Sequence, residues 1–209
     1  MWRVLPGVVG RCEDPTLRRF GGSLNHSGPA ARALLFCMNL AVDDFELFGL
    51  PRRYALDRGE IDARRRALQA EVHPDRFAAA DAAARRAAMQ WAVRVNAAYE
   101  RLADPVRRGA YLCELAGVPI GAEDNTAMPA EFLHQQMAWR ESLEEATSRN
   151  DVDAVERELE RERRLARERL AAALDERHDA VEAAGEVRAL MFIERFAADV
   201  GRRQAAFEG

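Results

Sequence analysis

Residues 73–77 of this 209-residue chain are His73-Pro74-Asp75-Arg76-Phe77. Proline lacks a backbone N–H and disfavours the helical conformation of the residue before it, so we expect a helix to end at His73. Asp75 can accept hydrogen bonds in the turn that follows, and the next helix begins no earlier than about Phe77. The stretch therefore predicts a bend between two helices.

Helical periodicity on both sides of the bend supports this prediction. Asp57 is expected to cap the preceding helix, with Glu60 as its capping-box partner. The buried side of that helix is predicted to hold Ile61, Leu68 and Val72. Over residues 81–102 the apolar positions recur at spacings of three and four: Ala88, Trp91, Ala92, Val95, Ala98, Tyr99 and Leu102.

Two shorter helices are expected on either side of this pair. The first is capped by Asp43 or Asp44 and is stopped by Gly49 and Pro51. Another follows Pro105 and ends at Gly117. Their apolar positions are Phe45, Leu47 and Phe48 in the first, and Val106, Tyr111, Leu112 and Leu115 in the second.

Residues 117–128 are rich in turn-forming residues and are predicted to be a linker. Three amphipathic segments follow. Asn150 and Asp151 are expected to break the pattern and cap the second segment, and Gly185 to separate the second from the third. Short connections between long helices indicate antiparallel neighbours, so residues 129–209 are predicted to form a three-helix bundle. The expected inward positions of the first segment are Phe132, Trp139, Leu143 and Ala146.

The charge pattern argues against nucleic acid as a partner. All 31 basic residues are arginine, and the net charge is −4. Residues 43–116 hold 13 arginines and 12 acids, and residues 129–209 hold 13 arginines and 19 acids. A nucleic-acid binder usually has a basic domain, and neither half is one. The sequence also lacks an apolar stretch long enough to span a membrane.

Residues 1–42 are rich in glycine and proline without a sustained period, which predicts a disordered extension. Two other interpretations stay open. The segment has more arginines than acidic residues, of which there are only two, and this excess is compatible with an organellar transit peptide. Alternatively, translation starts at Met38, just before the first organised segment.

The sequence predicts no catalytic residue, cofactor or metal site. It has no nucleophile motif, glycine-rich phosphate loop or paired carboxylates at diagnostic spacing. The cysteines Cys12, Cys37 and Cys113 are far apart, which fits a reducing compartment, and Cys113 is expected to be a packing residue. The remaining histidines are too scattered to suggest a metal site: His26, His134 and His178.

The consecutive arginines Arg64, Arg65 and Arg66 precede the His-Pro-Asp turn. A run of charge is usually a solvated helix face. Beside an exposed turn, however, it can also form a positive surface that steers an acidic protein partner.

Residues 43–112 resemble a J-domain, and the whole of residues 43–207 is similar to the HscB co-chaperones of iron–sulfur cluster assembly. The resemblance implies binding to a DnaK-type chaperone, HscA, whose ATPase is stimulated, and delivery of the scaffold protein IscU through the C-terminal bundle. One residue departs from the pattern, because Arg65 stands where J-domains usually carry an aromatic. The stretches that carry the resemblance are His73-Pro74-Asp75-Arg76-Phe77, Val95-Asn96-Ala97-Ala98-Tyr99, Leu102-Ala103-Asp104-Pro105 and Phe45-Glu46-Leu47-Phe48-Gly49-Leu50-Pro51.

Helical spacing predicts an exposed apolar patch on the bundle. Leu133 and Met137 lie well away from the expected inward stripe of their helix, and Phe192 is expected to point away from the inward face of its own. Such a patch is typical of a protein interface, although it could instead cover the linker or pack on the J-domain. The resemblance places the client-binding positions at Leu133, His134, Met137, Ala138, Glu141, Glu145 and Phe192, of which His134 and Ala138 differ from the usual residue types.

We therefore predict an all-α cytoplasmic adaptor with a J-domain at 43–116, a linker at 117–128 and a client-binding bundle at 129–209. Its partners are expected to be HscA and IscU. The predicted chaperone-binding residues are His73, Pro74, Asp75, Arg76, Arg64 and Arg66. Two alternatives are a general J-domain co-chaperone with a different client and a helical scaffold protein with an incidental His-Pro-Asp turn.

Overall fold

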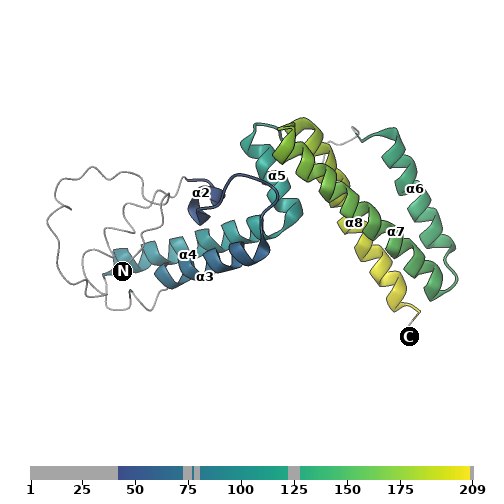
Figure 1. The fold of residues 1–209 in the computed structure, drawn as a ribbon. Helices are drawn as coiled ribbons and strands as arrows, with labels where there is room; N and C mark the ends of the chain where they lie inside the picture. Colours follow the sequence, from purple (N-terminus) through teal and green to yellow (C-terminus); the bar gives the residue numbers. More distant parts are fainter. Residues whose placement is uncertain (1–41, 73–76, 78–80, 122–127, 208–209) are drawn as a thin grey trace. The chain divides into compact units, whose positions relative to one another are not determined.

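The computed structural model of the protein describes residues 42–72, 77, 81–121 and 128–207. All regular elements in these ranges are helical, as Figure 1 shows, which confirms the all-α prediction. None of the described helices is both long and apolar enough to cross a membrane. The described residues form two compact units, which we treat separately.

The first unit contains α2 (Asp44–Phe48), α3 (Arg58–Val72) and α4 (Ala82–Ala103). Helices α3 and α4 lie side by side as an antiparallel pair, with α2 against both (Figure 1). The predicted caps are confirmed, because carboxylate oxygens of Asp43 and Asp57 accept hydrogen bonds from the first turns of α2 and α3. The side chains that fill the core are Phe45, Leu47, Phe48, Ile61, Leu68, Val72, Phe77, Ala88, Trp91, Val95, Ala98 and Leu102.

A buried carboxylate ties α2 to α4. Asp44 is fully buried, and its two oxygens pair with Arg94 at 2.5 Å and Arg101 at 2.8 Å. A buried charge is costly unless it is paired, and the two arginines provide such pairing for Asp44. The contact sets where α2 lies along α4.

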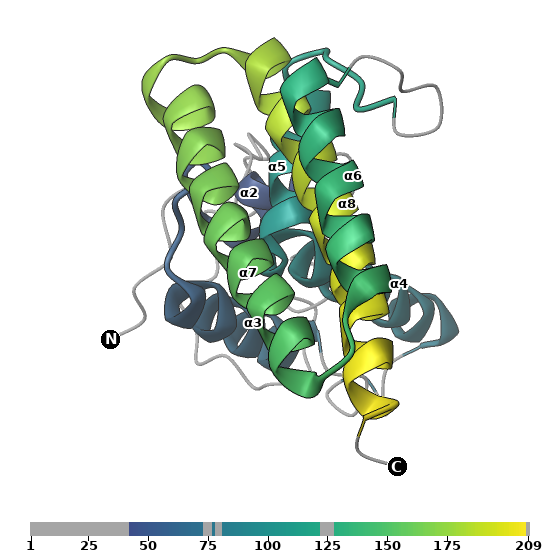
Figure 2. The ribbon, with the colours of Figure 1, turned by 90° about the vertical axis from the view of Figure 1, so that its right-hand side faces the viewer.

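The second unit contains α5 (Pro105–Leu115), α6 (Ala130–Glu145), α7 (Arg149–Ala171) and α8 (Ala180–Ala205). Helices α6, α7 and α8 form the predicted antiparallel three-helix bundle, and α5 packs against α8 (Figure 2). Gly109 allows this packing, since a Cβ there would lie 2.8 Å from Leu170 Cδ2 and 3.1 Å from Val187 Cγ2.

Residues 53–55 also belong to the second unit, although they connect α2 to α3 in the sequence. Asp175 accepts hydrogen bonds from the backbone N–H groups of Tyr54 and Ala55, at 2.7 and 2.8 Å. The guanidinium of Arg108 lies 5.2 Å from the centre of the Tyr54 ring. The compact units thus divide at Asp104–Pro105, and the J-domain range 43–116 stays a prediction from its motifs.

The ends of α7 differ from the expected ones. Ser148, two residues before Asn150, is the N-cap, and Asp151 acts as its capping-box partner. Gly185 does not separate α7 from α8: α7 runs into a π-helical turn, η3 (Ala172–Glu176), and α8 starts after Asp179. The break occurs there because the Asp179 side chain accepts from two N–H groups of the new helix. Gly185 lies inside α8, where the nearest atom to its Cβ position is a side-chain nitrogen of Arg188 at 3.8 Å.

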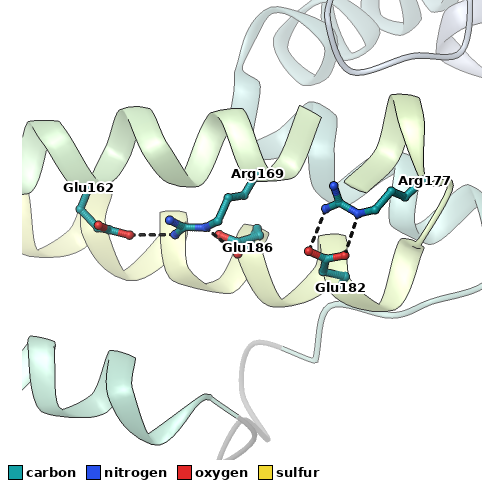
Figure 3. Close-up of polar contacts among 5 residues, drawn as sticks. All are labelled: Glu162, Arg169, Arg177, Glu182 and Glu186. Atoms are coloured by element: carbon teal, nitrogen blue, oxygen red, sulfur yellow. Dashed lines mark hydrogen bonds and ion pairs between the residues drawn. The ribbon is translucent and has the colours of Figure 1, made fainter. Parts of the chain in front are cut away.

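Arginines and glutamates link the C-terminal part of α7, and the turn that follows it, to α8. Figure 3 shows Arg169 between Glu162 and Glu186, at 2.8 and 2.9 Å, and Arg177 bound to both carboxylate oxygens of Glu182. Partial burial alone would lower the pKa of Arg169, but its hydrogen bonds to Glu186 and Glu162 raise it above the ordinary value. These contacts fix the register of α7 and α8.

Candidate functional site

The predicted chaperone-binding residues His73, Pro74, Asp75 and Arg76 lie outside the described residues. The nearest described residues are Val72, Phe77 and Asp81. Val72 and Phe77 are buried in the core of the first unit. Asp81 caps α4, accepting a hydrogen bond from the Ala84 N–H at 2.8 Å.

The three consecutive arginines of α3 do not gather into one patch. Arg66 is exposed. Arg64 is partly covered: its guanidinium lies 3.9 Å from Glu60 and close to Gly49 at the end of α2. The guanidinium carbon of Arg65 lies over the ring of Tyr99, 4.1 Å from its centre. Successive residues of a helix point about 100° apart, so the run presents charge on different sides of α3.

Tyr99 is the centre of a polar contact between α3 and α4. Its hydroxyl donates to Asp62 at 2.9 Å and accepts from Arg58 at 2.7 Å. Arg58 also donates to the carbonyl of Ala103 at 2.7 Å. These bonds hold α3, and hence its arginines, against α4.

The exposed patch predicted on α6 is present. Leu133 and Met137 are 42% and 64% exposed. The other predicted client-binding positions of α6 are also exposed: His134, Ala138, Glu141 and Glu145. The structure therefore brings an apolar pair and two acids together on the solvent side of one helix.

The expectation that Phe192 points away from the inward face of α8 is wrong. Phe192 is half-buried, and its ring stacks with Trp139 and Phe196 at centroid distances of 6.4 and 5.9 Å. It also meets Phe132 edge-on, at 5.9 Å. Aromatic side chains are large, so one that starts beside the inward face of a helix can still reach the rings packed there. Phe192 joins the edge of this cluster in that way.

Arg140 is a residue that the sequence analysis missed. It is exposed, and its guanidinium carbon lies 5.7 Å from the centre of the Phe192 ring. It follows Leu133 by seven residues and Met137 by three, a spacing that places all three on one side of a helix. That spacing could have placed Arg140 beside Leu133 and Met137. The contact of Arg140 with Phe192 joins two helices and could not be predicted from spacing.

Curated relatives place the chain in a family. A protein from Burkholderia multivorans named "Co-chaperone protein HscB homolog" is 53% identical over 167 residues, which cover 78% of this chain and 95% of that protein. A protein of the same name from Burkholderia cenocepacia is 52% identical with the same coverage. The chain belongs to the HscB family of co-chaperones.

Solved HscB structures have the same fold. HscB from Vibrio cholerae superposes with a TM-score of 0.73 at 35% identity, covering 78% of this chain and 99% of that one. Human HscB, at 24% identity, superposes with a TM-score of 0.77 over 88% of this chain and 92% of that one. The J-domain and helical bundle of HscB are thus the architecture of this chain.

The surface around α6 lies within the part of the chain that matches a family model. The family profile described as "HSCB C-terminal oligomerisation domain" matches residues 128–201. This range includes Leu133, Met137, Arg140 and Phe192. Among the described residues there is no group of three or more His, Cys, Asp or Glu side chains that could hold a metal ion.

Proposed function

We propose that this HscB-family protein is a cytoplasmic co-chaperone of iron–sulfur cluster assembly that stimulates the ATPase of HscA and delivers IscU to it. The observation that carries the proposal is the exposure of Leu133 and Met137 on the bundle of a chain that also has the His-Pro-Asp motif. An exposed apolar patch rimmed by polar side chains is typical of a protein interaction site. Two protein-binding sites on one chain are what an adaptor needs.

The chaperone contact is assigned to His73, Pro74, Asp75 and Arg76 with Arg64 and Arg66. Val72, just before the motif, and Phe77, its last residue, are both buried in the core of the first unit, which supports the assignment. Arg66 is exposed and Arg64 partly so, and their charges would steer an acidic surface of the chaperone. ATP hydrolysis itself takes place in the chaperone.

The client contact is assigned to Leu133, Met137 and Phe192, with His134, Ala138, Glu141 and Glu145 around them. Apolar side chains at the centre and charged ones at the rim are the usual anatomy of a protein interface. Binding chaperone and client on one chain raises their effective concentration for each other, so each contact can be weak on its own.

The test is an ATPase assay of HscA with IscU and the full-length chain. His73→Gln should abolish stimulation while IscU still binds, because the substitution leaves the bundle unchanged. Leu133→Ala should weaken IscU binding by roughly tenfold or more, as loss of a central apolar anchor does. Arg157→Ala, on the exposed side of α7, is the matched control and should change neither.

Two outcomes would contradict the proposal. Full stimulation by folded His73→Gln protein would remove the chaperone assignment. If His73→Gln abolishes stimulation but the unmodified chain does not bind IscU, the chain serves another client, as a general J-domain co-chaperone would.

A further inference from the structure

Helix α4 carries two exposed apolar side chains on the side that faces away from its own core. Met89 is 52% exposed and Val93 is 70% exposed, although Val93 stands between Trp91 and Val95, which are both buried. At about 100° per residue, Val93 points about 160° away from each of these two core residues. Outside α6, no other described helix exposes two large apolar side chains.

The neighbouring helices of the first unit contact other sides of α4. Towards α2, Arg94 pairs with the buried carboxylate of Asp44. Towards α3, the side-chain oxygen of Asn96 accepts a hydrogen bond from Gln69 at 3.0 Å. The remaining side of α4, centred on Val93, is left exposed.

Side chains of opposite charge stand at equal distances on either side of Val93. Arg86 lies seven residues before it and Glu100 seven residues after it, and both are exposed. Each is about 10 Å along the helix from Val93 and points within about 20° of it. Nearer the centre, Met89 stands four residues before Val93 and the exposed Ala97 four residues after it. This side of α4 therefore has an apolar centre, a positive end and a negative end.

This arrangement is complementary to itself in an antiparallel pair. When two copies of α4 lie in opposite directions and meet at Val93, each residue before Val93 faces the equally spaced residue after it in the other copy. Arg86 then faces Glu100 twice and Met89 faces Ala97 twice, as a contact about a twofold axis requires. A parallel pair would place Arg86 against Arg86 and Glu100 against Glu100, and repulsion between like charges would oppose it.

We propose that the side of α4 centred on Val93 binds a second copy of this chain through an antiparallel α4–α4 contact. The small side chain of Ala97 leaves room for the longer Met89 of the other copy. One helix face is smaller than the area that stable dimers bury, so the association depends on protein concentration. The contact belongs to the first unit and the α6 surface to the second, so the inference does not depend on the proposed function.

Sedimentation equilibrium of the full-length chain over a range of concentrations measures this association. Val93→Asp should weaken it about tenfold or more, because a charge would be buried at the centre of the contact. Arg86→Glu should also weaken it, and adding Glu100→Arg to the same chain should restore it, because the two charges are then exchanged. Arg157→Glu reverses an exposed arginine of α7 and is the matched control, which should associate as the native chain does.

Cross-linking tests the antiparallel direction without altering the charge pattern at both ends. In a Cys12→Ser, Cys37→Ser chain, a short bismaleimide should join two copies through Val93→Cys, since the central residue faces itself. Glu100→Cys should not be joined to its own copy, because the two positions are about 20 Å apart in an antiparallel pair. Circular dichroism checks that each variant is folded.

Four results would overturn the inference. A native chain that sediments as a monomer at every concentration has no such contact. A dimer that Val93→Asp leaves intact is held together elsewhere in the chain. Efficient cross-linking through Glu100→Cys would show a parallel pair. If the native chain is monomeric and folded Val93→Asp protein no longer stimulates the chaperone ATPase, this side of α4 faces the chaperone instead.

Discussion

The guanidinium of Arg65 lies over the ring of Tyr99, with its central carbon 4.1 Å from the ring centre. J-domains usually carry an aromatic at the position of Arg65. Here a cation stacks on an aromatic of the neighbouring helix and fills the same place between α3 and α4. The contact explains how the chain accommodates an arginine at this edge of the core.

We predict that Arg65→Ala loosens the α3–α4 pair. Loss of the cation–π contact and of the arginine stem should cost about 1 kcal/mol of stability. Hydrogen exchange of the α3 and α4 amides would show it as faster local opening. Arg66→Ala, one residue on and exposed, should leave exchange unchanged. Equal effects of the two substitutions would show that the stack does not stabilise the pair.

Asp175 offers a second test, in the other unit. Because its carboxylate accepts from two backbone N–H groups, of Tyr54 and Ala55, Asp175→Ala should destabilise the unit by roughly 2 kcal/mol, a value typical of hydrogen bonds to a charged group. Urea unfolding followed by circular dichroism measures the loss. The exposed neighbour Glu176 provides the control, Glu176→Ala, and a similar loss there would refute the role of Asp175.

Two glycines of the second unit should respond to alanine in opposite ways. Gly109→Ala places a Cβ 2.8 Å from Leu170 Cδ2 and should destabilise the protein by about 1–3 kcal/mol through overpacking. Gly201, in α8, has nothing within 4 Å of its Cβ position. Gly201→Ala should therefore stabilise by about 0.5–1 kcal/mol. Thermal unfolding of both variants measures these changes, and a Gly109→Ala protein as stable as the native one would contradict the packing described for α5.

Cys113 gives the pH prediction. Burial raises its pKa from 9.0 to about 11. Between about pH 9 and about pH 11 the thiol keeps its proton in the folded protein but loses it in the unfolded chain. Folding stability should therefore fall as the pH rises through this range. In a Cys12→Ser, Cys37→Ser protein, the fall in unfolding free energy over this range should disappear on Cys113→Ala. Rapid labelling of Cys113 by a thiol reagent at pH 8 in the folded protein would argue against its burial.

Local signals explain why much of the fold was predictable. Asp43 and Asp57 stand directly before apolar periodicity, and each proves to be a helix cap. Gly185 misled the prediction because a glycine in a helical pattern signals a possible end, whereas the real end depends on the side chain of Asp179. In the sequence, Gly185 and Asp179 are both compatible with a break between two helices. The packing of α8 along α7 determines which of the two positions is the actual break.

The candidate site was predictable only in part, for a different reason. Exposure of Leu133 and Met137 follows from spacing along one helix. The positions of Phe192 and Arg140 depend on contacts between α6 and α8, which are distant in sequence. Periodicity along a single helix cannot say which of its edge residues a neighbouring helix will cover.

The place of residues 53–55 has a practical consequence for dissecting the two activities. These three residues belong to the C-terminal unit but lie between α2 and α3, so no single cut of the chain separates one unit from the other. A fragment that begins after α5 would lose Tyr54 and Ala55, and with them the two N–H groups that donate to Asp175. A truncated protein that fails to bind a partner could therefore have lost either the binding site or its fold. Point substitutions avoid this ambiguity.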